Sequence, residues 1–339
     1  MKSDTKIKIA INGFGRIGRN LLRLLIHHPR IEVVAINDLA DTATMSHLFK
    51  YDSVHGKLST SVSYDENHLI VNDLKIAFLH EKDITKINWK PFNPDFVVEA
   101  TGKHKTTELL QNHIKNGAKR VILSVPPFDN DIKTVVLGVN DSILKGDELI
   151  VSNASCTTNN AAPMIKVIKE LCGLDKAFIT TVHSYTTDQS LHDQPHKDLR
   201  RARAAAQSII PTTTGAAKAL TKIFPEYEGR IGGGGIRVPV PDGSLTDITC
   251  YVNRDVTEEE INLAFKNSSE KDLKGILEYT EEPIVSVDVL GNTHSCLFDA
   301  QLTVVLGRMV KVVGWYDNEI GYCSRLIDLI LSLSKPKDI

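Results

Sequence analysis

The feature that most constrains the fold is a glycine motif near the N-terminus. Gly13-Phe14-Gly15-Arg16-Ile17-Gly18 matches the pattern GxGxxG. A buried strand is predicted before it, over Ile7–Ile11, a helix after it, over Arg19–His27, and then a second buried strand, over Ile31–Ile36. A strand, a glycine turn, a helix and a second strand form a βαβ unit, in which the two strands are parallel. The N-terminal part of the chain is therefore predicted to be a doubly wound α/β domain.

The same motif predicts a dinucleotide site. Gly13 permits a tight turn, Gly15 lets the backbone approach a pyrophosphate, and Gly18 allows close packing of helix and strand, as in the Rossmann fold. Asp38, at the end of the second strand, is predicted to accept hydrogen bonds from the adenosine ribose, and its charge would repel a 2′-phosphate. NAD is therefore expected rather than NADP, with Ser124 also assigned to the cofactor site. The alternative is a glycine turn that binds no ligand.

The second half of the chain has a different pattern. After about Val151, long predicted strands are separated by few helices, which indicates a second, catalytic domain of α+β type with a largely antiparallel sheet. These strands are expected at Lys176–His183, Gly234–Val240, Leu245–Val252, Ile284–Val289 and Gln301–Val305. We expect an NAD-binding domain over 1–155 and a catalytic domain over 156–317. A C-terminal helix within 318–339 is expected to pack back on the first domain.

Charge and cysteine content indicate which kinds of ligand and partner the protein is expected to bind. A formal net charge of −2 over 339 residues lacks the basic excess usual in proteins that bind nucleic acid or anionic membranes. No segment approaches the roughly 18 uncharged apolar residues of a membrane span, and no apolar signal segment opens the chain, so a cytoplasmic protein is expected. The five cysteines contain no CxxC pair, which argues against a disulfide framework and a metal site. A small soluble substrate and no metal are expected.

Cys156 is the candidate nucleophile. It follows a predicted strand, Leu149–Ser152, and opens a helical pattern, so it is expected at a helix N-terminus, which stabilises a thiolate. His183, at the end of a predicted strand, is its candidate base. Most free cysteines are buried small hydrophobes, and that reading is kept for Cys172, Cys250, Cys296 and Cys323. The polar neighbours of Cys156 favour a reactive site there without deciding it.

Six further segments carry a resemblance that extends over nearly the whole chain. They are NASCTTN around Cys156, HSYTTDQ from His183, DLRRARAAA from Asp198, IIPTTTGAAKAL from Ile209, RVPVPDGSLTD from Arg237 and WYDNEIGY from Trp315. In order and separation these segments resemble the signatures of the phosphorylating glyceraldehyde-3-phosphate dehydrogenases. The resemblance implies a homotetramer that acts on glyceraldehyde 3-phosphate and inorganic phosphate with NAD, in glycolysis and gluconeogenesis.

The resemblance also implies roles for individual residues. Cys156 would be the nucleophile and His183 the base. Thr186 and Arg237 would bind the substrate phosphate, and Ser155, Thr157, Thr214 and Gly215 the inorganic phosphate. Asn318 would bind the nicotinamide carboxamide, and Arg16 and Ile17 the pyrophosphate and adenosine. Cys156 would add to the aldehyde, the hemithioacetal would pass a hydride to NAD, and phosphate would release the resulting thioester as 1,3-bisphosphoglycerate.

Two alternatives remain open at this level. Erythrose-4-phosphate dehydrogenase shares the cysteine, the histidine and the NAD site, although a phosphate-binding Thr214-Gly215 pair favours the triose enzyme. A catalytically idle NAD-binding or nucleic-acid-binding protein could keep the fold, but it would be expected to lose Cys156 or His183, and both are present. The basic cluster Lys197, Arg200, Arg201 and Arg203 is interpreted as a solvated or subunit-contact loop rather than a nucleic-acid patch.

Overall fold

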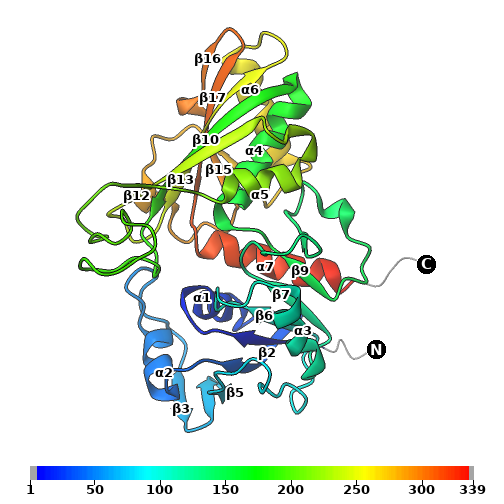
Figure 1. Ribbon diagram of the computed structural model, residues 1–339, viewed down its shortest axis with the longest axis vertical. Helices are drawn as coiled ribbons and strands as arrows, with labels where there is room; N and C mark the ends of the chain where they lie inside the picture. The colour runs from blue at the N-terminus through cyan, green and yellow to red at the C-terminus, as the bar shows by residue number, and fades with distance from the viewer. Residues whose placement is uncertain (1–5, 336–339) are drawn as a thin grey trace. The chain divides into compact units, whose positions relative to one another are not determined.

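The computed structural model describes residues 6–335 and divides them into two compact units (Figure 1). The first unit comprises residues 6–135, 142–154 and 323–335, and the second comprises residues 136–141 and 155–322. Residues 336–339 of the predicted C-terminal segment lie outside the described residues. Each unit has its own sheet and helices.

The first unit is built on a nine-stranded sheet in the order β3-β4-β5-β2-β1-β6-β7-β9-β8. The strands are β1 (Ile7–Asn12), β2 (Ile31–Asn37), β3 (Val62–Asp65), β4 (His68–Val71), β5 (Leu74–Leu79), β6 (Phe96–Glu99), β7 (Arg120–Leu123), β8 (Lys133–Thr134) and β9 (Ile150–Ser152). Neighbours from β5 to β8 are parallel, and β3 and β4 add an antiparallel edge. The predicted doubly wound sheet is confirmed.

Four helices accompany this sheet. They are α1 (Arg16–Leu25), α2 (Thr42–Lys50), α3 (Thr107–Lys115) and the last helix of the chain, α7 (Ile320–Leu333). From Cys323 onward, α7 belongs to the first unit, where the Arg120 guanidinium donates to the Leu333 carbonyl. Of the helices in residues 6–335, none is both long enough and apolar enough to cross a bilayer.

Helix α1 begins at Arg16, three residues before the predicted start. Gly15 is its N-cap, and Gly18 lies in the first turn instead of in the preceding loop. A Cβ on Gly18 would lie 2.3 Å from the Gly13 carbonyl oxygen, so only glycine allows the helix to start this close to β1. The predicted role of Gly18 in close packing is confirmed, and only the start of the helix was placed too late.

The second unit has an eight-stranded sheet in the order β11-β12-β10-β13-β17-β15-β14, with β16 paired to β17. The strands are β10 (Leu174–Ser184), β11 (Ile210–Thr212), β12 (Ile231–Val238), β13 (Ser244–Val252), β14 (Leu277–Thr280), β15 (Cys296–Asp299), β16 (Val304–Leu306) and β17 (Met309–Tyr316). The pairs β10/β12 and β14/β15 are parallel and the others antiparallel, so the predicted largely antiparallel sheet is confirmed.

Helices α4 (Cys156–Cys172), α5 (Ala216–Ile223) and α6 (Glu258–Glu270) pack against this sheet (Figure 1). Residues of β10 and β13 alternate between buried and less buried, as expected where one face is covered and the other is open. Phe178 and Tyr251 point away from the buried face and are 57% and 46% exposed. The sheet therefore presents aromatic side chains on an open face.

Two predicted strands differ from the structure. Ile284–Val289 contains a 3-10 turn at Ser286–Val289, and Gln301–Val305 begins in a 3-10 turn, Ala300–Leu302, before strand β16 starts at Val304. In the first of these segments, the Asp288 carboxylate accepts the Val285 N–H at 2.8 Å, which closes a turn, and Val285 is 56% exposed. A run of β-branched residues favours a strand, but a local side-chain acceptor and the lack of a partner strand prevail here.

Candidate active site

Cys156 is the first residue of α4, so its predicted place at a helix N-terminus is confirmed. Ser155 is the N-cap, and its hydroxyl accepts the Thr158 N–H at 3.2 Å. Ala154, just before the cap, has a φ of 57°, a left-handed conformation that is uncommon for residues with a Cβ. The tight connection from β9 to α4 presents the thiol where the helix N–H groups and the positive end of the helix dipole are directed.

His183 lies beside this thiol. Its Nε2 is 3.5 Å from Cys156 Sγ, and its Nδ1 is 2.8 Å from the Ser184 carbonyl oxygen. The Ser184 carbonyl can only accept, so this contact is a hydrogen bond in the tautomer protonated at Nδ1, whose free Nε2 lone pair faces the sulfur. In that tautomer the Arg237 guanidinium, which only donates, makes no hydrogen bond to Nδ1. The pairing of thiol and base, expected from sequence, is present in the structure.

Arg237 completes the group through strand register. In the parallel pair β10/β12, His183 is opposite Arg237. The guanidinium Nη1 donates to the Ser184 carbonyl at 2.8 Å and lies 2.5 Å from His183 Nδ1. The four glycines before it, Gly232–Gly235, are also part of strand β12. Arg237 is therefore held by a regular sheet.

Burial sets the ionisation of this pair. Burial raises the pKa of the Cys156 thiol. The Arg237 charge and the Thr157 N–H act to lower the same pKa, but their effect is smaller. Burial also lowers the pKa of His183 to about 3, with Arg237 adding to the effect. The expectation of a thiol pKa lowered by the helix is thus wrong for this site, because desolvation outweighs the positive groups. Both shifts favour the neutral thiol and the neutral imidazole.

The residues predicted to bind inorganic phosphate lie at two helix N-termini of the second unit. Ser155 and Thr157 flank Cys156 at the start of α4, while Thr214 and Gly215 lie at the start of α5, where Gly215 is the N-cap. A Cβ built on Gly215 meets nothing within 4 Å, so the space beside it is open. Helix N-termini offer unpaired N–H groups to anions. Thr186, predicted for the substrate phosphate, follows β10 two residues after its last residue.

Arg201 is a further candidate residue of the active site, and its sequence context did not single it out. It was interpreted as part of a solvated cluster, but its side chain donates to Thr212 Oγ1 at 2.8 Å, to Asp188 at 2.7 Å and to the Thr213 carbonyl at 3.1 Å. Its charge acts to lower the pKa of both His183 and Arg237. The signal available in sequence was weak, because three other basic residues surround it.

Two buried polar residues fix α4 against the sheet. The hydroxyl of Tyr316 lies 2.9 Å from Thr157 Oγ1 and 3.0 Å from Thr181 Oγ1. Asn160, one turn after the nucleophile, donates to the carbonyls of Ser295 and Trp315. The start of α4, and with it Cys156, is thereby anchored from β10 and β17.

Asn318 lies between β17 and α7 and is 7% exposed. Its amide oxygen accepts from the Ser184 hydroxyl at 2.8 Å and from the Ser244 hydroxyl at 2.7 Å. Among residues 6–335, no acceptor pairs with its amide nitrogen. Asn318 is therefore an oriented donor, as a carboxamide-binding residue must be.

The glycine motif in the first unit has the geometry of a dinucleotide turn. Gly13 has a φ of 96°, and a Cβ there would lie 2.7 Å from the Thr101 backbone nitrogen. A Cβ on Gly15 meets nothing within 4 Å, which leaves open space at the start of α1. The Asp38 carboxylate accepts the N–H groups of Phe14 at 2.7 Å and Ala40 at 3.0 Å. These contacts fix the acid beside the glycine turn and leave lone pairs for hydroxyl donors.

The remaining residues assigned to the cofactor site, Arg16, Ile17 and Ser124, also belong to the first unit. The Arg16 guanidinium forms an ion pair with Asp52 at 2.5 Å, so its backbone N–H at the start of α1 is the group suited to a pyrophosphate. Ile17 follows it in the first turn. Ser124, just after β7, is buried and donates its N–H to the Glu99 carbonyl.

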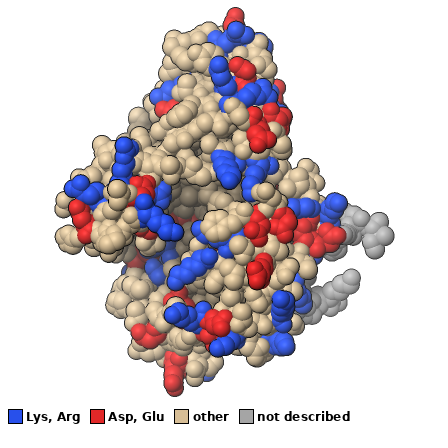
Figure 2. All heavy atoms as spheres, viewed as in Figure 1, with Lys and Arg blue, Asp and Glu red and all other residues tan. Residues whose placement is uncertain are grey.

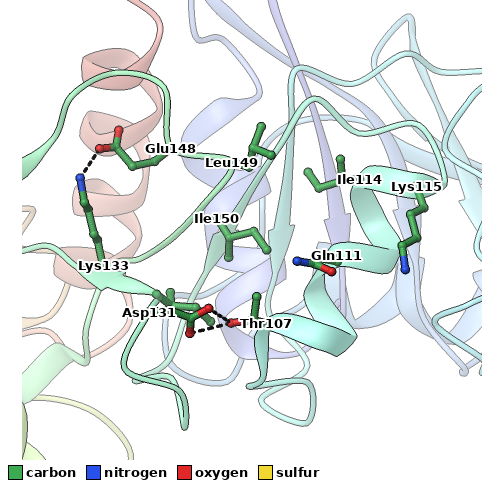
Figure 3. A pocket seen from close by; sticks show the side chains of 10 residues that line it. Thr107, Gln111, Ile114, Lys115, Asp131, Lys133, Glu148, Leu149 and Ile150 are labelled. Carbon is green, nitrogen blue, oxygen red and sulfur yellow. Dashed lines mark hydrogen bonds and ion pairs between the residues drawn. The ribbon is translucent and has the colours of Figure 1, made fainter.

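A separate groove of about 430 Å³ lies in the first unit between α3 and the strands β8 and β9 (Figure 3). Its lining is Thr107, Gln111, Ile114, Lys115, Asp131, Ile132, Lys133, Glu148, Leu149 and Ile150. The polar groups at its rim are paired with one another, Thr107 with Asp131 and Lys133 with Glu148. The residues predicted for the cofactor and substrate are not part of this lining.

Charges on the surface are mixed in sign. On the face drawn in Figure 2, Lys and Arg side chains alternate with Asp and Glu over the surface. In the basic cluster, Arg203 pairs with Asp193 at 2.8 Å and Arg201 with Asp188. A surface that binds nucleic acid usually gathers basic side chains in one stripe.

Comparison with known proteins gives two family matches. The profile described as "Glyceraldehyde 3-phosphate dehydrogenase, NAD binding domain" matches residues 7–107, and "Glyceraldehyde 3-phosphate dehydrogenase, C-terminal domain" matches residues 155–318. The matched regions contain the glycine motif in the first case and Cys156, His183, Arg237 and Asn318 in the second.

Relatives that match over nearly their whole length have the same name as the two profiles. The chain is 50% identical over 331 residues to "Glyceraldehyde-3-phosphate dehydrogenase 1" of Bacillus subtilis, which covers 97% of this chain and 98% of the relative. It is 51% identical over 325 residues to the glyceraldehyde-3-phosphate dehydrogenase of Geobacillus stearothermophilus, covering 95% and 97%. It is 52% identical over 331 residues to that of Thermotoga maritima, covering 97% and 99%.

Proposed function

Since the chain belongs to the glyceraldehyde-3-phosphate dehydrogenase family, we propose that it oxidises glyceraldehyde 3-phosphate to 1,3-bisphosphoglycerate with NAD and inorganic phosphate. The observation that carries this proposal is the contact of Cys156 Sγ with His183 Nε2 at the start of α4, beside the guanidinium of Arg237. The nearest alternative, erythrose-4-phosphate dehydrogenase, is not favoured, because the relatives from Bacillus subtilis, Geobacillus stearothermophilus and Thermotoga maritima are named for the triose phosphate.

NAD is the cofactor, and the residues of the first unit fit it. The open space at Gly15, the N–H groups at the start of α1 and the fixed Asp38 carboxylate suit a pyrophosphate and a ribose diol. Asn318 would donate its amide N–H to the nicotinamide carboxamide. When bound, NAD supplies the acceptor of two electrons that the oxidation of the aldehyde requires.

The chemistry on this chain begins at the thiol. Cys156 Sγ bonds to the aldehyde carbon while the thiol proton passes to His183 Nε2, and the carbonyl oxygen takes up the electron pair of the broken π bond. The Cys156 backbone N–H and the protonated His183 are placed to stabilise that oxygen. Protonated His183 passes its proton to that oxygen to give the hemithioacetal, and takes the proton back as the C–H hydride leaves and the thioester forms.

Two phosphate groups, one on the substrate and one inorganic, take part in the reaction. Arg237 and Thr186 would hold the substrate phosphate, because a fixed guanidinium and a hydroxyl complement phosphate oxygens. Ser155, Thr157, Thr214 and Gly215 would hold inorganic phosphate at the two helix N-termini. A phosphate oxygen then attacks the thioester carbon, the C–S bond breaks, and Cys156 leaves with the electron pair and regains a proton from His183.

Initial rates of NADH formation test the proposal. Glyceraldehyde 3-phosphate and erythrose 4-phosphate are compared, each with and without inorganic phosphate. Fast turnover of the triose that depends on phosphate is expected. Preference for the tetrose, or indifference to phosphate, would transfer the proposal to the related dehydrogenase, and no turnover with either would support an idle binding protein.

Asp38→Ala should relax discrimination against NADP. The carboxylate accepts ribose hydroxyls and repels a 2′-phosphate, and a hydrogen bond to a charged group is worth about 1.5–3 kcal/mol, so the ratio of kcat/KM for NAD over NADP should fall about 10- to 100-fold. Asp38→Asn is the matched variant, because it keeps an acceptor for the Phe14 N–H and removes the charge. An unchanged ratio in both variants would remove the assigned role of Asp38.

Arg237→Leu should weaken the reaction of the phosphorylated aldehyde most. Loss of a charge-assisted hydrogen bond predicts a fall in kcat/KM of about 10- to 100-fold beyond any loss with unphosphorylated glyceraldehyde. Arg237 also contacts His183 and Ser184, so the comparison of the two aldehydes separates phosphate binding from support of the base. Equal losses with both aldehydes would count against the phosphate role.

The same proposal includes a cytoplasmic homotetramer. The open face of the second sheet, with Phe178 and Tyr251, and the exposed Leu191 and Leu199 in the loop after β10 provide apolar surface for subunit contacts. The five cysteines are unpaired, as a reducing compartment allows. Sedimentation equilibrium and cell fractionation test these two statements.

A further inference from the structure

The amide of Asn318 is held by two buried serines from different strands. Ser184 ends β10 and Ser244 begins β13, and both side chains are almost fully buried. Their hydroxyl oxygens lie 2.8 Å and 2.7 Å from the same atom, the amide oxygen of Asn318. Ser244 Oγ also accepts the Ser184 N–H at 3.1 Å. Its own hydrogen therefore has the Asn318 oxygen as its acceptor.

These contacts select one orientation of the amide. If the amide were rotated by 180°, its NH2 group would face both serines, and neither hydroxyl would have an acceptor within residues 6–335. A buried hydroxyl whose hydrogen has no acceptor is destabilising. The two serines therefore keep the oxygen of Asn318 toward themselves and its NH2 group on the opposite side.

The backbone beside Asn318 is fixed as well. The Asp317 carboxylate accepts the N–H groups of Glu319 at 2.8 Å, Ile320 at 2.7 Å and Gly291 at 2.8 Å. The backbone next to Asn318 and the oxygen of its side chain are thus both held, and within residues 6–335 the NH2 group of that side chain has no acceptor.

Ser184 also connects this amide to the reacting centre. Its carbonyl accepts from His183 Nδ1 and from Arg237 Nη1, both at 2.8 Å, while its hydroxyl donates to Asn318. One residue at the end of β10 thereby positions the base, the guanidinium and the amide. A site that depends on mutual geometry gains from such shared support.

We propose that Ser184 and Ser244 are positioning residues that direct the Asn318 NH2 group at the carboxamide of the nicotinamide, and so decide which face of the ring is turned to the substrate. This inference rests on the proposed function, in which Asn318 binds that carboxamide. The carboxamide has an oxygen acceptor on one side and an NH2 donor on the other. A donor fixed in space pairs with the oxygen and disfavours the reversed ring.

The test measures binding of NAD and of ADP-ribose by titration calorimetry. Ser184→Ala and Ser244→Ala should each weaken NAD binding about threefold, and the double variant about tenfold, since each removes one hydrogen bond. ADP-ribose lacks the nicotinamide, so its dissociation constant should stay unchanged. Asn318→Ala sets the upper limit of the loss, and Ser295→Ala, at a buried serine elsewhere in the second unit, is the control.

A second readout follows the ring face directly. With glyceraldehyde 3-phosphate deuterated at C1, NMR of the reduced cofactor shows which face carries the label. The parent protein should label one face, and the double serine variant should label both to a measurable extent. Equal weakening of NAD and ADP-ribose, or an unchanged NAD affinity with one labelled face, would overturn the positioning role.

These outcomes distinguish the inference from the function on which it rests. If Asn318→Ala leaves NAD affinity unchanged, the assignment of Asn318 to the carboxamide fails. If Asn318→Ala weakens NAD binding and the double serine variant does not, the cofactor role of Asn318 stands and only the role of the two serines is lost.

Discussion

Cys156→Ser is expected to abolish the phosphorylating oxidation, with turnover lowered by at least about 10⁴-fold, as for the loss of a covalent nucleophile. A hydroxyl at this position is a much weaker nucleophile than a thiol and forms an ester that phosphate cleaves less readily than a thioester. NAD binding should be largely intact, because the glycine turn and Asp38 lie in the first unit and Cys156 lies in the second. Stopped-flow measurement of NADH formation, with NAD titration on the same preparation, gives both values.

The matched control for this variant is Cys172→Ser, at the other end of the same helix. Cys172 Sγ donates to the Ile168 carbonyl at 3.3 Å, and a serine hydroxyl can do the same. Cys172→Ser should therefore keep normal turnover. Near-normal turnover in Cys156→Ser would show that the reaction does not pass through a covalent intermediate on this residue.

His183→Asn is expected to lower kcat by about 10²- to 10⁴-fold, the usual contribution of a positioned general base. The change keeps a polar side chain of moderate size and removes the Nε2 lone pair that faces Cys156 Sγ at 3.5 Å. Because burial raises the pKa of the Cys156 thiol, little thiolate forms without a base at neutral pH. The rate should therefore depend on hydroxide in the variant.

The dependence of the rate on pH should differ between His183→Asn and the parent protein. The pKa of His183 is lowered to about 3, so in the parent protein the imidazole is unprotonated throughout the neutral range. In His183→Asn the residual rate should rise about tenfold per pH unit below the thiol pKa, and the rate of the parent protein should rise less steeply. His294→Asn, in the same unit and bound to Glu278, is the control and should leave the profile unchanged. Parallel profiles for His183→Asn and the parent protein would exclude His183 as the base.

Local patterns predicted the first unit well and parts of the second less well. Strands β1 and β2 each begin where predicted and end one residue beyond the prediction. Parallel strands buried on both faces are continuous apolar runs, which are easy to recognise. The start of α1 was placed three residues late because Gly18, which lies in the first turn of the helix, was counted with the glycine turn before it. The false strand at Ile284–Val289 arose because partner strands are not visible in a local pattern.

The residues of the candidate active site also differ in how far a local pattern predicts them. The position of Cys156 followed from a strand, a polar turn and a helix in succession, which are all local. Arg201 was misjudged because its partners Asp188 and Thr212 are brought to it by the fold. The ionisation of Cys156 was misjudged because burial, which raises the thiol pKa, is a property of the folded unit.

The sequence by itself determined that the chain has a dinucleotide turn, an acid beside it and a cysteine at a helix N-terminus, because each depends on residues adjacent along the chain. Only the tertiary structure decided how the second group is assembled. His183 and Arg237 meet because β10 and β12 pair in one register, and Asn318 is oriented because β10 and β13 bring Ser184 and Ser244 to the same amide oxygen. Hydrogen bonds and desolvation act over a few ångströms, and distances of that size between residues far apart in the chain exist only after folding.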